Sequence, residues 1–82
     1  MNSELRRLYS PHLIEVEVGP DGRPLVVEGV GVEAVREEWV VDDRWWDRRP
    51  LRRRYFELAL ADGRSLVVFR DLASGDWYRQ RA

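Results

Sequence analysis

Apolar and polar residues alternate in several short stretches of the chain, which is the pattern of half-buried β-strands. Residues 12–18 alternate between an apolar face and a face that carries two glutamates. Residues 19–24 supply turn chemistry, because proline presets φ and glycine adopts positive φ. A second apolar stretch returns at residues 25–28. We therefore predict a hairpin over residues 12–29.

The next segment, residues 32–46, permits two interpretations. Val32, Val35 and Trp39 have helical spacing, and good helix formers lie between them. The β-forming residues that begin at Trp39 favour a strand, and no N-cap residue precedes the segment. We predict a strand over residues 32–41 and keep the helix as the alternative.

A second hairpin is predicted over residues 51–61 and 65–71. The Asp-Gly pair at positions 62–63 is typical of a two-residue type I′ turn. In that register the numbers of opposed residues sum to 125, so Phe56 faces Phe69 on the buried side. A slip by one residue would turn side chains to the other face.

A turn around Ser74 and Gly75 then leads to a short last strand that begins at Trp77. The count is five to six antiparallel strands with short connections. The predicted fold is all-β, a small antiparallel barrel or curled sheet of SH3-like architecture, because closure limits exposed sheet edges. Residues 1–82 hold one domain, and the polar residues 1–10 are expected to form a flexible arm.

Composition excludes several classes of function. Cysteine is absent and His12 is the single histidine, which leaves no disulfide framework and argues against a zinc site or a Ser-His-Asp triad. No glycine-rich phosphate loop and no outstanding carboxylate pair is present, so we expect neither catalytic residues nor a cofactor. The N-terminus lacks a targeting signal and the apolar runs are short, so we expect a cytoplasmic protein without membrane contact.

The basic residues carry a second compositional signal. All 14 are arginine, which a GC-rich genome explains. Few thermolabile side chains together with many charges of both signs also fit a heat-adapted, thermophilic organism. The net charge of −1 predicts no global attraction to nucleic acid or membrane.

The charge is nevertheless uneven, because residues 42–54 hold six arginines against three aspartates. Arginine binds phosphates, tryptophan stacks on unpaired bases, and both residue types anchor protein interfaces. Three interpretations stay open, namely a structural cluster, a protein interface and a nucleic-acid interface. The candidate binding surface comprises Arg44, Trp45, Trp46, Arg48, Arg49, Arg52, Arg54, Tyr55 and Arg70.

Alternation refines the positions of the later members. Arg52 and Arg54 share the face of the predicted core, so their guanidinium groups should emerge at a barrel mouth. Arg53 points the other way, beside Tyr55 and, across the ladder, near Arg70. In the predicted register Tyr55 also faces Arg70, which suggests a cross-strand cluster that includes Glu57 and stabilises the surface.

The second half of the chain carries a recognisable series of elements. They are Trp45-Trp46-Asp47, Pro50, Arg52-Arg53-x-Tyr55-Phe56, Asp62-Gly63-Arg64, Val68-Phe69-Arg70-Asp71 and Ser74-Gly75-x-Trp77-Tyr78. Over residues 45–78 this series resembles a bacterial family of short proteins of unassigned function. It is also similar to the extreme C-terminal segment of the inactive Y-family DNA polymerase homologues that mutasome operons encode.

The resemblance implies a non-enzymatic accessory module of DNA repair or translesion synthesis. Such a module would bind DNA or a mutasome protein through the candidate surface, and it would carry no catalytic residues because the polymerase carboxylates lie in other domains. The chain departs from those homologues by standing alone, so activities that need tethering to a polymerase are not implied. The alternative is a protein-interaction or homo-oligomerising β domain, such as a homodimer, without a nucleic-acid role.

Overall fold

The computed structural model describes residues 12–43 and 51–80, and within them it contains strands and turns without a helix. The all-β prediction is confirmed, as is the strand over residues 32–41. The expected arm at residues 1–10 lies outside the described residues. The strands are β1 (His12–Ile14), β2 (Val16–Val18), β3 (Pro24–Val27), β4 (Val30–Asp43), β5 (Leu51–Leu60), β6 (Ser65–Asp71) and β7 (Trp77–Arg79).

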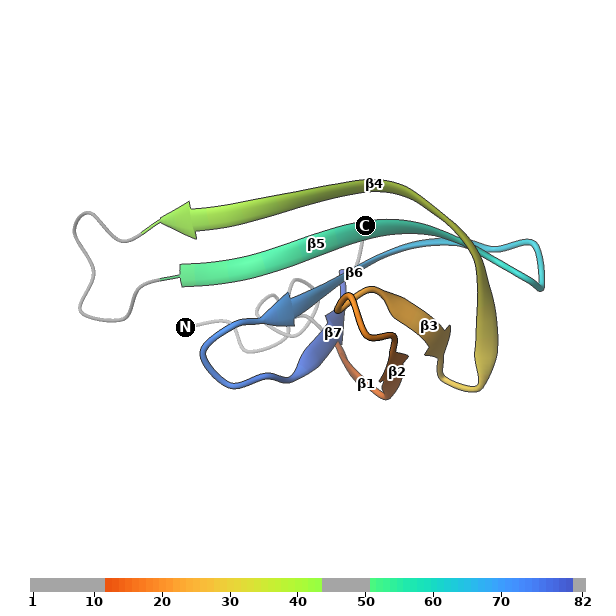
Figure 1. The fold of residues 1–82 in the computed structure, drawn as a ribbon, viewed down its shortest axis with the longest axis horizontal. Coiled ribbons are helices and arrows are strands. Elements are labelled where there is room, and N and C mark those ends of the chain that lie inside the picture. The colour runs from red at the N-terminus through yellow and green to blue at the C-terminus, as the bar shows by residue number, and fades with distance from the viewer. Residues whose placement is uncertain (1–11, 44–50, 81–82) are drawn as a thin grey trace, which may run out of the picture.

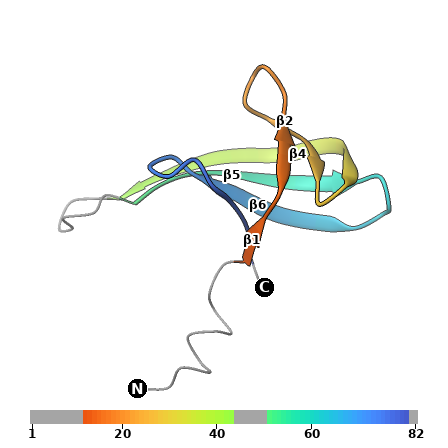
Figure 2. The ribbon, with the colours of Figure 1, turned by 90° about the horizontal axis from the view of Figure 1, so that it is seen from below.

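The seven strands form one antiparallel, barrel-like sheet in the order β1-β7-β6-β5-β4-β3-β2 (Figure 1). The first and last strands of this order are separated in sequence by Glu15 alone. The strand predicted over residues 12–18 therefore divides into two, which corrects the expected five or six strands to seven. Its first half pairs with β7 and its second half with β3, so one stretch of chain spans both ends of the sheet (Figure 2).

Irregular pairing in strand β4 allows the sheet to curve. Register shifts between Val32 and Ala34 and between Val35 and Glu37 mark irregular pairing with β5. Bulges of this kind bend a strand and increase its twist. The strand thereby curves around the molecule, and only its first two residues, Val30 and Gly31, pair with β3 (Figure 1).

The two-residue type I′ geometry occurs between β3 and β4 instead of at the predicted Asp-Gly pair. Its central residues Glu28 and Gly29 have φ values of 48° and 80°. Glu28 is the one described residue other than glycine with positive φ. Its amide donates to the Glu15 carbonyl at 2.9 Å and its carboxylate accepts from the Glu15 amide at 3.3 Å. These hydrogen bonds hold a conformation that glutamate rarely adopts.

The β5–β6 connection is a three-residue loop, so the predicted type I′ turn at positions 62–63 is wrong. The Gly63 amide donates to the Leu60 carbonyl, the Leu60 amide donates to the Arg64 carbonyl, and of the pair only Gly63 has positive φ. Asp62 accepts from the Arg64 amide at 3.1 Å, which stabilises this form. The register sum is therefore 124 instead of 125.

This shift separates the two phenylalanines that were expected to face each other. Phe56 is opposite Val68 on the inner face, and Phe69 is opposite Tyr55 on the outer face. Both rings are nonetheless buried. The inner core cluster comprises Ile14, Val27, Phe56, Leu58, Leu60, Leu66, Val68 and Trp77. Phe69 is absent from this cluster, so something other than the barrel core covers it.

Candidate interaction surface

A row of four aromatic rings crosses the outer face of the sheet. Trp39, Tyr55, Phe69 and Tyr78 come from β4, β5, β6 and β7, and each is directly opposite the next in register. Their consecutive ring centroids lie 5.2, 5.0 and 5.2 Å apart. Cross-strand aromatic pairs at this spacing stabilise a sheet beyond the area that they bury. We call these four residues the outer aromatic row.

Arg53 covers the middle of the outer aromatic row. Its guanidinium carbon lies 4.4 Å from the centre of the Phe69 ring, and its Nη1 donates to the Tyr55 hydroxyl at 3.3 Å. Phe69 is therefore only 1% exposed, between two rings and beneath a cation. The Arg53 Nε is buried without a hydrogen-bond partner. The prediction that Arg53 points away from the core and lies beside Tyr55 is confirmed. Its expected position near Arg70 is wrong, because Arg70 lies on the other face of the sheet, opposite Arg54.

On the opposite face, Glu38 of β4 binds two arginines at one mouth of the barrel. Arg54 donates to the Glu38 carboxylate from Nε at 2.8 Å and also from Nη2, and Arg23 of the β2–β3 turn donates at 3.2 Å. The Arg54 hydrogen bonds hold the pKa of the Glu38 carboxyl below its ordinary value, and Arg23 adds to this effect while desolvation opposes it. We call Arg23, Glu38 and Arg54 the mouth cluster.

Most of the predicted binding residues either contact other side chains of the same chain or lie outside the described residues. Arg54 shares the core face as expected, but it packs 4.9 Å from the Phe56 ring centre within the mouth cluster. Arg52 is exposed and lies 3.8 Å from an Asp42 carboxylate oxygen. Five members of the candidate surface lie outside the described residues, namely Arg44, Trp45, Trp46, Arg48 and Arg49.

The expected cluster of Tyr55, Glu57 and Arg70 is wrong, because the register shift moves Arg70 to the inner face. Arg70 is opposite Arg54, its guanidinium lies 5.7 Å from the Trp77 ring centre, and its Nε donates to the Gly75 carbonyl at 3.1 Å. The aromatic and cationic partners of Tyr55 are Trp39, Phe69 and Arg53 instead.

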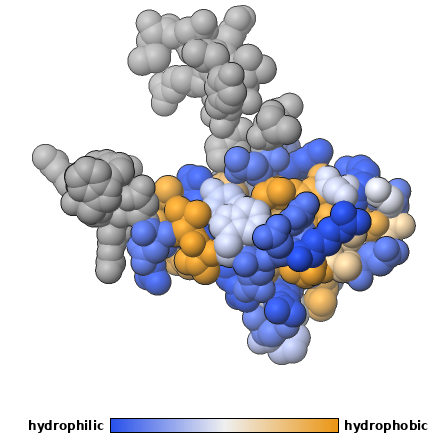
Figure 3. All heavy atoms as spheres, turned by 90° about the horizontal axis from the view of Figure 1, so that it is seen from above, coloured by the Kyte–Doolittle hydropathy of each residue, from blue (hydrophilic) through white to orange (hydrophobic). Residues whose placement is uncertain are grey.

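One edge of β4 is open within the part of the chain that the structure describes. Among residues 12–43 and 51–80, β4 beyond Gly31 pairs with β5 alone, although it continues to Asp43. Trp39 and Val40 on this stretch are 39% and 58% exposed. Viewed from the β4 side, hydrophobic and hydrophilic spheres are interleaved over the surface (Figure 3). Long edges with exposed apolar residues are sites where another chain can pair.

The open stretch of β4 is also acidic. Residues 33–43 contain five acidic side chains and one basic side chain. Glu37 is directly opposite Glu57, and within the described part of the chain neither carboxylate has an ion pair or hydrogen-bond partner. Like charges that face each other across strands destabilise the pair.

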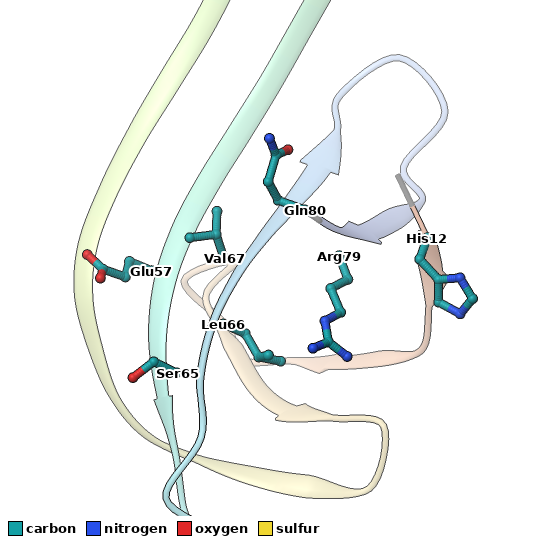
Figure 4. Close-up of a pocket in the computed structure, with 7 residues that line it drawn as sticks. All are labelled: His12, Glu57, Ser65, Leu66, Val67, Arg79 and Gln80. Atoms are coloured by element: carbon teal, nitrogen blue, oxygen red, sulfur yellow. The ribbon is translucent and has the colours of Figure 1, made fainter. Parts of the chain in front are cut away.

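A surface hollow elsewhere offers no obvious chemistry. It is lined by His12, Glu57, Ser65, Leu66, Val67, Arg79 and Gln80. Their side chains spread apart, with Glu57 and Ser65 on one side and His12 on the other (Figure 4). Among residues 12–43 and 51–80 no cluster of three metal-ligating side chains occurs, and no helix there could cross a membrane.

Comparisons of the chain with protein-family models, curated proteins and solved structures find no match. Sequence reasoning missed three features of the site, namely the outer aromatic row, the role of Glu38 and the open edge of β4. The sequence signal for one of them is the even spacing of Trp39 and Val41, which places both side chains on one face of a strand.

Proposed function

We propose that this domain is a non-enzymatic protein-interaction module that binds its partner along β4. The open edge of β4 supports the proposal, because it presents exposed Trp39 and Val40 beside backbone groups that pair with no other described strand. Exposed tryptophan is a preferred anchor of protein interfaces. Of the functions considered from sequence, the proposal keeps the accessory module that binds a protein and leaves out binding of DNA by the sheet.

Electrostatics favours a protein over DNA as the partner of the sheet. Residues 12–43 and 51–80 contain 13 acidic and eight basic side chains, a formal charge of −5. Arg54 is paired with Glu38, and Arg52 lies beside Asp42. A phosphate backbone would therefore meet a field of its own sign over this part of the chain.

We further propose that the partner belongs to the DNA-repair or translesion-synthesis machinery. The support for this setting is the resemblance of residues 45–78 to the C-terminal segment of mutasome polymerase homologues. In this proposal the domain reaches DNA synthesis through a protein contact of β4. The arginine-rich residues 44–50 then need not bind DNA for the module to act.

The proposal is tested by capture from nuclease-treated lysate of the native host on the immobilised chain. The Val40→Ser variant removes an exposed apolar side chain of β4, and Leu25→Ser is the matched control because Leu25 is similarly exposed, at 54%, on β3. We expect a repair protein that the wild type and Leu25→Ser retain and Val40→Ser loses. Tight binding of labelled single-stranded or duplex DNA, with no protein lost on Val40→Ser, would overturn the proposal.

A further inference from the structure

We propose that the open edge of β4 binds a basic, extended segment of the partner protein as an additional β-strand. This inference deepens the proposed function and depends on it. It concerns the stretch from Glu37 to Val41, where the register with β5 is regular. Strand addition of this kind takes affinity from main-chain hydrogen bonds and specificity from alternate side chains.

The backbone groups available at this edge follow from the hydrogen bonds of β5. The Leu72 amide donates to the Arg52 carbonyl at 2.9 Å, so the backbone groups of Arg52 face away from β4. Along a strand, the amide and carbonyl groups of successive residues point to opposite sides. In an antiparallel pair, two opposed residues point these groups either both towards each other or both away from each other. The amide and carbonyl groups of Glu38 and Val40 therefore face the open side.

Side chains next to this edge define the residues that an added strand should carry. One face of the Trp39 indole stacks on Tyr55 with an interplanar angle of 4°. An aromatic residue opposite Trp39 on the added strand would extend the outer aromatic row by one more ring. Two positions along the added strand, a residue on the same face would lie opposite Glu37.

The charges around Glu37 select a basic residue at that position. Glu37 and Glu57 face each other without a cation among the described residues, so a guanidinium or ammonium group would relieve their repulsion. The expected segment thus carries an aromatic residue and a basic residue two positions apart. Neutral or acidic segments would leave the repulsion in place.

The same charges disfavour the edge of a second copy. Residues 33–43 have a formal charge of −4, so pairing of two β4 edges would bring two such segments together. They also disfavour a nucleic acid, which carries one negative charge for each phosphate. A basic peptide strand is the occupant that satisfies both the open backbone groups and the acidic side chains.

The test uses a fluorescein-labelled nonapeptide in which Arg and Tyr alternate on one face and Thr and Val on the other. Two control peptides keep its length, one with Glu in place of Arg and one with N-methyl groups on alternate amides of the edge that pairs. We expect binding by fluorescence anisotropy, at least tenfold weaker for either control. Equal binding of the N-methylated peptide would overturn strand addition, and equal binding of the Glu peptide would overturn the charge argument.

Two proline variants make the test independent of folding. The Val40 amide faces the open side, so Val40→Pro should keep the β4–β5 ladder and reduce peptide binding at least tenfold. The neighbouring Val41 amide faces β5, so Val41→Pro should lower the melting temperature. Unchanged peptide binding by a folded Val40→Pro variant would overturn the assigned edge.

Failure of this inference and failure of the proposed function give different results. If host capture depends on Val40 but the peptide does not bind, the interaction function stands and the basic-strand inference is wrong. If sedimentation of the wild type shows a dimer that Val40→Pro dissolves, the occupant is a second copy and the inference is wrong.

Discussion

The mouth cluster allows a quantitative test of how the barrel is closed. Glu38 accepts hydrogen bonds from Arg54 of the neighbouring strand and from Arg23 of the turn between β2 and β3. The second contact links the hairpin at one end of the sheet to the long strands. Replacing Glu38 with Gln keeps the size of the side chain and removes the charge that both guanidinium groups share.

The expected loss is moderate because the cluster is partly exposed. The side chain of Glu38 is 26% exposed, whereas that of Arg23 is 54% exposed. Hydrogen bonds to charged groups contribute about 1.5–3 kcal/mol, and exposed ion pairs contribute about 0.2–1 kcal/mol. We therefore expect Glu38→Gln to lower the free energy of unfolding by about 1.5 kcal/mol, dominated by the Arg54 contact. In a domain of this size that corresponds to a decrease of about 6–12 °C in Tm.

Dependence on pH separates this cause from a packing defect. The pKa of Glu38 is lower in the folded protein than in the unfolded chain. The ionised carboxylate therefore stabilises the folded protein at pH values above the ordinary carboxyl pKa, and this stabilisation is lost as the pH falls through the folded-state pKa. Urea titrations at neutral and acidic pH should show that the difference between wild type and Glu38→Gln decreases on acidification. Glu33→Gln, on the same strand at an exposed position, is the matched control and should change stability little. A difference that is independent of pH, or equal to that of Glu33→Gln, would refute the reasoning.

Two further substitutions test the turn contact and the outer face. Gly22→Ala should lower the free energy of unfolding by about 1–2 kcal/mol because Gly22 has positive φ, and Gly29→Ala should do the same. Gly22→Ala should in addition displace Arg54, whose Nη1 lies 2.7 Å from the position of the added Cβ. The losses of unfolding free energy caused by Gly22→Ala and Glu38→Gln, measured by denaturant unfolding, should therefore not add up in the double variant. Additive losses would show that the contact between Gly22 and the Arg54 side chain is unimportant. Phe69→Leu should cost about 2 kcal/mol through two lost ring contacts and a lost cation–π contact, and a smaller loss than that of the exposed Leu72→Ala would contradict the outer aromatic row.

The positions of the strands were predictable because alternation and turn residues are local signals. The identity of the turns was not, since Asp62 and Gly63 form the strongest type I′ signal of the chain but close a three-residue loop. The choice depends on the Asp62 carboxylate, which binds the Arg64 amide and side chain. The actual type I′ turn places Glu28 at positive φ, a conformation that the distant Glu15 stabilises.

This single-residue difference in register explains why the candidate site was only partly predictable. With a sum of 125, Phe69 belonged to the core and Tyr55 faced Arg70. With a sum of 124, Phe69 joins Tyr55 on the outer face and Arg70 faces Arg54 within the barrel. Burial of Phe69 does not distinguish these alternatives, because Arg53 buries the ring on the outer side. Hydrophobicity alone therefore assigns this phenylalanine to the wrong face.

The two faces of β4 also divide stability from binding. On the inner face Glu38 is held by two arginines, which fixes the strand against β5 and against the β2–β3 turn. On the outer face Trp39 is fixed by its contact with Tyr55, while the backbone groups of Val40 face the open side. A strand held on one side and open on the other is preorganised for an added strand, because little further ordering accompanies binding. Glu38→Gln should consequently lower stability more than it lowers peptide affinity in the folded protein, and Val40→Pro should do the reverse.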